Sequence, residues 1–63
     1  MGTTYSVQDI DKLVGKEVIV IEGNIREGGK LYLEDGKYKV INVFGQVVYE
    51  VDENNPDVVI FTE

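Results

Sequence analysis

The chain has 63 residues, a net charge of −6 and neither cysteine nor histidine. Its length allows one domain, and the missing residue types exclude disulfide bonds, the common zinc sites and nucleophile–histidine catalysis. The negative charge argues against electrostatic binding to nucleic acid or to anionic membranes. Eleven valines and six isoleucines against three leucines indicate a mainly β protein, because β-branched side chains pack well on pleated sheets.

The first predicted element is a short helix over residues 7–14. Its apolar face is formed by residues at helical spacing: Val7, Ile10, Leu13 and Val14. Ser6, the only serine, is placed to cap the N-terminus, and Gly15 is expected to end the helix. The residues before it lack the basic start of a signal peptide, and no apolar run is long enough to span a membrane, so a cytoplasmic protein is expected.

Five strands are predicted after the helix, and glycine-containing turns are predicted to separate most of them. The strands cover residues 16–22, 30–34, 37–44, 46–51 and 58–61. The turns contain Gly23, the pair Gly28 and Gly29, the type I′ pair Asp35 and Gly36, and Gly45. A small sheet leaves two exposed edges unless it curls on itself. We therefore predict a single domain over residues 1–63, a five-stranded antiparallel barrel with one short N-terminal helix.

Residues 37–51 are predicted to form the central hairpin of the core. Apolar and polar residues alternate on both arms, and Gly45 lies between them. In the first arm Tyr38, Val40 and Phe44 share one face, so Phe44 is expected in a strand. The role predicted for this hairpin is that of a scaffold.

No enzymatic, cofactor or metal site is predicted. A carboxylate pair would need a deep cleft for acid–base catalysis, and a barrel of this size rarely has one. Residues 52–57 offer oxygen ligands of the kind that calcium binds, but Pro56 and Asp57 occupy positions where a calcium loop has an oxygen ligand and a glycine. A polar turn that contains the only proline is the favoured interpretation of this segment.

Three strings carry a resemblance to a known family: GKEVIVIEG, DGKYKVINVFGQVVYEVDE and VVIF. Together they span residues 15–62 and resemble SH3-like small β-barrels, including those of short phage and bacterial proteins. The resemblance implies an SH3-like or OB-like barrel and a phage-type protein that binds or inhibits a host protein. The second string is also similar to the hairpin of KOW-type elements, which implies nucleic-acid binding. Such domains are usually basic, whereas no base follows Lys39 in this chain.

The leading functional hypothesis is a small acidic, non-enzymatic protein–protein interaction module. Its partner is expected to be a protein, and a basic protein would complement the acidic surface; no membrane contact is expected and nucleic acid is not favoured. The predicted contact residues are Arg26, Tyr32, Glu50, Asp52, Glu53 and Asp57. The alternative is a KOW-like or OB-like nucleic-acid-binding domain that uses Arg26, Lys37, Tyr38 and Lys39.

Overall fold

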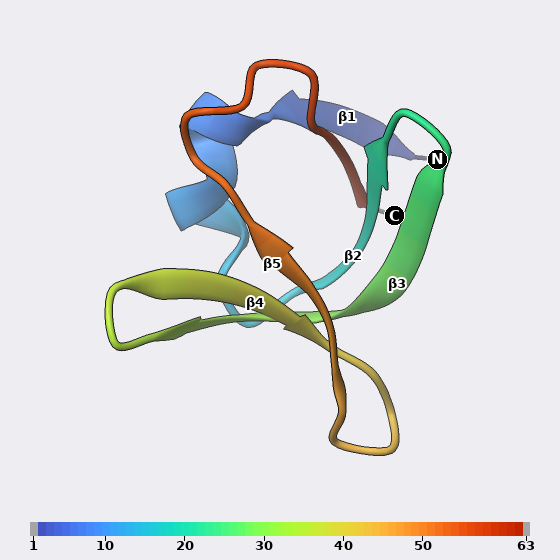
Figure 1. Ribbon diagram of the computed structural model, residues 1–63, viewed down its shortest axis with the longest axis vertical. Coiled ribbons are helices and arrows are strands. Elements are labelled where there is room, and N and C mark those ends of the chain that lie inside the picture. The colour runs from blue at the N-terminus through green and yellow to red at the C-terminus, as the bar shows by residue number, and fades with distance from the viewer. Residues whose placement is uncertain (1, 63) are drawn as a thin grey trace.

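The computed structural model describes residues 2–62, which form one antiparallel sheet of six strands and one short helix (Figure 1). In chain order the elements are β1 (Thr3–Ser6), the 3-10 helix η1 (Val7–Leu13), β2 (Glu17–Glu22), β3 (Ile25–Glu34), β4 (Lys37–Ile41), β5 (Val47–Val51) and β6 (Val59–Thr62). Strands lie in the order β1-β6-β2-β3-β4-β5, so β2 to β5 form a meander and β6 returns beside β2. The predicted mainly β fold with one short helix is confirmed.

Two parts of the fold prediction are wrong. The sheet has six strands rather than five, because β1 pairs with β6, with Thr4 opposite Phe61. The sheet is also not closed: within residues 2–62, β1 and β5 are its two edges and no ladder joins them. The strands curl around the core without completing a barrel (Figure 1).

The long strand β3 produces much of this curl. Its residues 25–30 pair with β2 and its residues 30–34 pair with β4, so Lys30 lies opposite both Glu17 and Ile41. Gly28 and Gly29 lie inside the strand next to this change of partner, and the glycine turn predicted there is wrong. A Cβ atom on Gly29 would lie 2.5 Å from the carbonyl oxygen of Ile41, so only glycine allows the two backbones to approach this closely.

The helix is confirmed, but it is a 3-10 helix rather than an α-helix. Val7, Ile10 and Leu13 are three residues apart and all buried, which suits a helix of three residues per turn. Val14, predicted on the same face, is exposed. Gly15 has φ of 87° and follows the helix as expected, whereas Ser6 makes no side-chain capping hydrogen bond.

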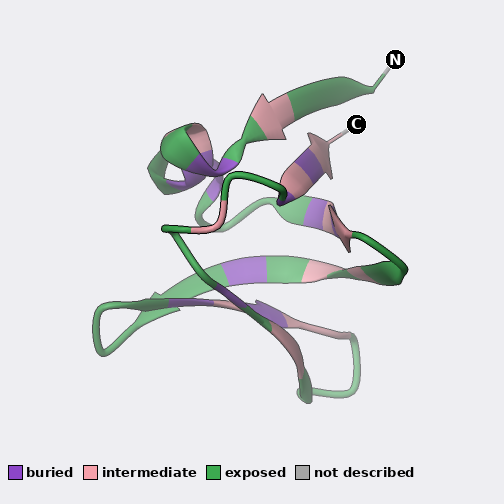
Figure 2. Cartoon of the chain, turned by 45° about the horizontal axis from the view of Figure 1, so that its top comes forward, coloured by how far each residue is buried: buried purple, intermediate pink, exposed green. Residues whose placement is uncertain are grey.

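The core fills the inside of the curled sheet (Figure 2). It consists of Val7, Ile10, Leu13, Val18, Val20, Leu31, Tyr38, Val40, Val51, Val58 and Ile60, all of them buried. Alternate residues of β2 point inward, as shown by Val18 and Val20, and the next strands supply their partners across the core. Burial of this apolar surface is the main source of stability in a chain without disulfides.

The β3–β4 and β4–β5 hairpin turns contain the glycine predicted for them. Asp35 and Gly36 have φ of 53° and 75°, which agrees with the predicted type I′ turn. Gly45, with φ of 79°, lies in the turn between β4 and β5. However, β4 ends at Ile41, so Phe44 belongs to the turn and not to a strand.

Candidate interaction site

An apolar groove lies on the outer face of the sheet, away from the core. Because β2 carries four consecutive apolar residues, Ile19 and Ile21 point outward while Val18 and Val20 point inward. Ile19 lies opposite Phe61 of β6. The groove has a volume of about 710 Å³ and is lined by Gly2, Glu17, Val18, Ile19, Ile21, Arg26, Gly28, Gly29, Asn42, Val43, Phe61 and Thr62.

A missing side chain helps to form this groove. Gly28 lies opposite Ile19 in the ladder between β2 and β3, at a position where any other residue would project onto the outer face. A Cβ atom on Gly28 would have no neighbour closer than the Ile19 side chain at 3.7 Å. Unlike Gly29, this position could therefore accept a Cβ atom in ordinary van der Waals contact, and its missing side chain leaves the outer face uncovered there.

The structure separates two residues that were predicted to act together. Arg26 lies in the half of β3 that pairs with β2, opposite Ile21, and it lines the groove. Tyr32 lies in the half that pairs with β4, opposite Lys39, and it is exposed but does not line the groove. The segment between them is strand and not the turn predicted from its two glycines.

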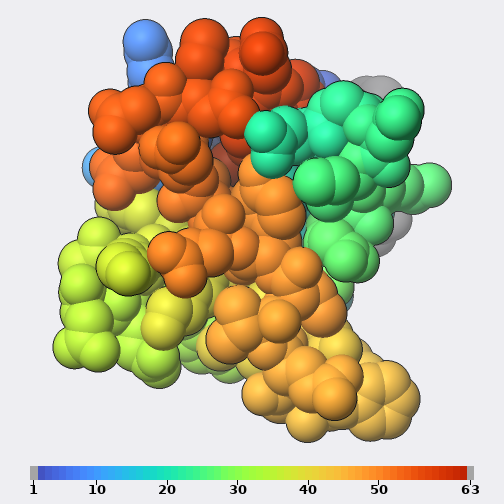
Figure 3. All heavy atoms as spheres, viewed as in Figure 1, coloured from blue at the N-terminus to red at the C-terminus, as the bar shows by residue number. Residues whose placement is uncertain are grey.

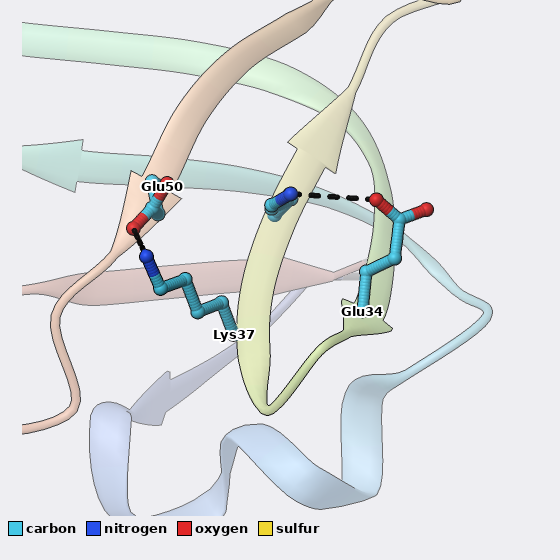
Figure 4. A network of polar contacts seen from close by, with 4 residues as sticks. Glu34, Lys37 and Glu50 are labelled. Atoms are coloured by element: carbon cyan, nitrogen blue, oxygen red, sulfur yellow. Dashed lines mark hydrogen bonds and ion pairs between the residues drawn. The ribbon is translucent and has the colours of Figure 1, made fainter.

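Two exposed ion pairs lie on strands β3, β4 and β5, and Glu50 takes part in one of them (Figure 4). Its Oε1 atom lies 3.7 Å from Nζ of Lys37, and Nζ of Lys39 lies 3.3 Å from Oε1 of Glu34. Exposed pairs of this kind contribute little to stability. They do neutralise both lysines of the β4–β5 hairpin, which reduces the positive charge available there for an anionic ligand.

Three of the predicted acidic residues lie close together at the end of β5. Glu50, Asp52 and Glu53 line a shallow depression, whereas Asp57 lies outside it. Oδ1 of Asp52 accepts a hydrogen bond of 2.9 Å from the backbone N–H of Asn54. This contact confirms the polar turn predicted for residues 52–57, in which side chains satisfy the local backbone.

Glu22 connects β2 with the edge strand β5 and with the loop that follows β5, a role that the sequence did not reveal. It ends β2, and its Oε1 atom accepts a hydrogen bond of 2.5 Å from the hydroxyl of Tyr49 in β5. Its Oε2 atom accepts a hydrogen bond of 2.6 Å from Nδ2 of Asn55. The partners are 27 and 33 residues away in the chain, so no local pattern identifies them. We call these three residues the Glu22 clasp.

The clasp changes the acidity of Tyr49. Burial, the hydrogen bond to Glu22, and the negative charges of Glu22 and Asp52 raise the pKa of Tyr49 from 10.0 to about 12. The folded state therefore favours the neutral phenol. The contribution of Tyr49 to the free energy of unfolding is therefore complete below pH 10 and is lost as the pH rises from 10 to about 12.

A Tyr49→Phe substitution is expected to lower the free energy of unfolding at pH 7 by about 1 kcal/mol, since a hydrogen bond to a carboxylate is lost. Between pH 10 and 12 the difference from the unsubstituted protein should shrink, because only the latter must ionise a phenol beside Glu22. Urea denaturation at pH 7, 10 and 11.5 measures both effects. A difference that stays constant with pH would contradict the role of the clasp.

The β4–β5 turn presents two apolar side chains to solvent. Val43 is 90% exposed and Phe44 is 83% exposed. The turn projects from the body of the molecule (Figure 3). Oδ1 of Asn42 accepts hydrogen bonds from the backbone N–H groups of Phe44 and Gln46, at 2.9 and 3.0 Å. The side chain of Asn42 thus satisfies two backbone N–H groups of its own turn.

No helix in residues 2–62 has the length and apolar character needed to cross a membrane. Comparison of the chain with protein-family models, with curated proteins and with solved structures found no match. Function must therefore be argued from the surface itself.

Proposed function

We propose that the chain is a small acidic, non-enzymatic protein–protein interaction module with an SH3-like fold. The observation that carries this proposal is the apolar groove on the outer face of β2, β3 and β6. Single exposed apolar residues are ordinary on a protein surface, but a groove lined by several of them is typical of an interaction site. Ile19, Ile21 and Phe61 are only partly buried in the isolated chain, so a partner would complete their burial.

The groove suits an apolar segment of a partner protein. Arg26 and Glu17 line it on either side of Ile19 in the ladder between β2 and β3. Neither of the two forms an ion pair within residues 2–62, so both are available to fix the orientation of a partner. The resemblance to short phage and bacterial proteins makes a bacterial host protein the partner class that we propose to screen first.

Nucleic-acid binding is the less favoured function. Tyr38, one of the residues that it would use, is buried and unavailable for stacking on a base. Lys37 and Lys39 each have a carboxylate within 4 Å, at 3.7 and 3.3 Å. Of the predicted residues only Arg26 remains exposed without an ion pair in the described part of the chain, and one cation is little for a site that must attract phosphates.

A Gly28→Val substitution is expected to abolish binding to the partner while the domain stays folded. The new Cβ atom has room, since its nearest neighbour lies at 3.7 Å, and valine favours strand conformation. Its methyl groups would occupy the groove opposite Ile19. The measurement is affinity capture from bacterial lysate on the immobilised protein, with identification by mass spectrometry. Circular dichroism checks the fold of the variant.

The matched control is Asp11→Ala, which changes an exposed residue of η1 outside the groove and should capture the same proteins as the unsubstituted chain. Equal capture by the Gly28→Val variant would refute the groove as the binding site. A titration with single- and double-stranded DNA and RNA tests the alternative. Micromolar binding that weakens steeply with salt would establish nucleic-acid binding instead.

A further inference from the structure

The edge strand β5 is a second surface on which a partner could bind. Strand β5 lies at the end of the sheet, and in the described part of the chain β4 is its only neighbour in the sheet. No hydrogen bond outside the ladder with β4 reaches the backbone of Val47–Val51 within residues 2–62. An edge of this kind leaves backbone N–H and C=O groups free to pair with another extended segment.

Features that usually protect an edge strand are scarce in β5. Proteins block such edges with proline, with lysine or with a covering element. Strand β5 contains no proline and no lysine, and its single charged residue is Glu50. Other chains also use such open edges for recognition: a peptide adds as a further strand, its backbone supplying affinity and its side chains supplying specificity.

The charge around β5 indicates which segment fits. Residues 40–62 contain no lysine or arginine, and Glu50, Asp52 and Glu53 lie together at the C-terminal end of β5. Within residues 2–62, only Glu50 of these three forms an ion pair, with Lys37. A segment with basic residues at this end would be attracted, and an acidic one would be repelled.

The opposite end of β5 is apolar. The β4–β5 turn precedes the strand directly and holds Val43 and Phe44 in the solvent, 90% and 83% exposed. Because Asn42 makes two hydrogen bonds to the backbone of this turn, the turn loses little additional conformational entropy when an apolar side chain packs on Phe44. The two ends of this edge therefore differ in chemical character: one is acidic and the other is apolar.

We propose that β5 binds an extended segment of a basic protein by strand addition, with lysine or arginine beside Glu50, Asp52 and Glu53 and an apolar side chain beside Phe44. A second copy of this chain fits less well, since pairing β5 with β5 would bring two acidic ends of molecules with net charge −6 into one interface. The other edge, β1, has no charged residue and offers no such preference. This surface shares Val43 with the groove, but β5 and its acidic end lie outside the groove lining and are tested separately below.

The test uses three capped peptides: KKTVTVL, its reversal LVTVTKK, and the acidic form EETVTVL. They are titrated into the isotope-labelled full chain at low salt and followed by NMR of the backbone amides. One of the two basic peptides should shift the amides of Val47–Val51 together with those of Val43 and Phe44, and the orientation that binds identifies parallel or antiparallel addition. The acidic peptide should bind at least about tenfold more weakly.

A charge-matched pair of variants sharpens the result. Glu50→Lys should weaken binding of the basic peptide about tenfold, whereas Asp11→Lys on η1 changes the net charge equally and should change the affinity less than about twofold. Gly28→Val should bind the peptide normally, which separates this site from the groove. The proposal is overturned if neither basic peptide shifts β5, if the acidic peptide binds equally well, or if β1 responds instead. It is also overturned if light scattering shows a dimer and dilution to the monomer shifts the amides of β5.

Discussion

A Val20→Asp variant is expected to be unfolded at 25 °C. The side chain of Val20 is 0% exposed at the centre of the core, between Glu27 of β3 and Ile60 of β6 in the two ladders. A carboxylate there would have no cationic partner, and burying an unpaired charge costs several kcal/mol. The free energy of unfolding of a domain of this size is roughly 3–9 kcal/mol, so this cost removes most or all of its stability.

Circular dichroism and the dispersion of the NMR spectrum would measure this loss. Two aspartate substitutions elsewhere serve as controls. Ile41→Asp replaces a partly buried residue on the outer face of β4 and should destabilise the domain less. Val43→Asp, in the exposed turn, should leave it folded. A folded Val20→Asp variant would mean that the inner and outer faces of the sheet are assigned the wrong way round.

Gly29→Ala is expected to lower the free energy of unfolding by about 3 kcal/mol, the upper part of the range for overpacking a filled space. The added methyl group would lie 2.5 Å from the carbonyl oxygen and 2.8 Å from the carbonyl carbon of Ile41. These are backbone atoms of β4, so the two strands must separate where β3 changes its partner. Urea denaturation measures the change.

The adjacent residue provides the control for this prediction. Gly28→Ala adds the same methyl group one position earlier in β3, where the nearest atoms lie at 3.7 and 3.8 Å. Its effect should lie within about 0.5 kcal/mol of zero or be slightly stabilising, because alanine reduces the entropy of the unfolded chain. If both alanine variants lose equal stability, the loss comes from strand propensity or solvent exposure and not from the close approach of β4.

The order of the elements after residue 6 could largely be predicted from local patterns. Three-residue spacing places Val7, Ile10 and Leu13 on one buried face, and a β-branched run becomes β2. The turn at Asp35 and Gly36 was correctly predicted because left-handed conformations restrict which residues fit. These features depend on neighbours within a few residues, so the sequence contains them directly.

The glycine pair in β3 shows where such local reasoning fails. Two adjacent glycines usually indicate a turn, yet Gly28 and Gly29 continue a strand, since β4 crosses too close to allow a side chain on Gly29. Strand β1 was missed for a similar reason: Thr3–Ser6 has no strong alternation and becomes a strand only because β6 offers it an edge.

Some features of the candidate surfaces could likewise be predicted from the residues, whereas others depend on how the strands pack. The β-rich composition, the absence of cysteine and histidine, and the lack of any base after Lys39 can be read directly from the residues. The folded sheet was needed to show that Arg26 and Tyr32 lie on different halves of a bent strand, that Glu22 bonds Tyr49, and that Ile19 lines a groove. These relations depend on which strands lie side by side, because pairing between distant segments is set by packing of the whole core.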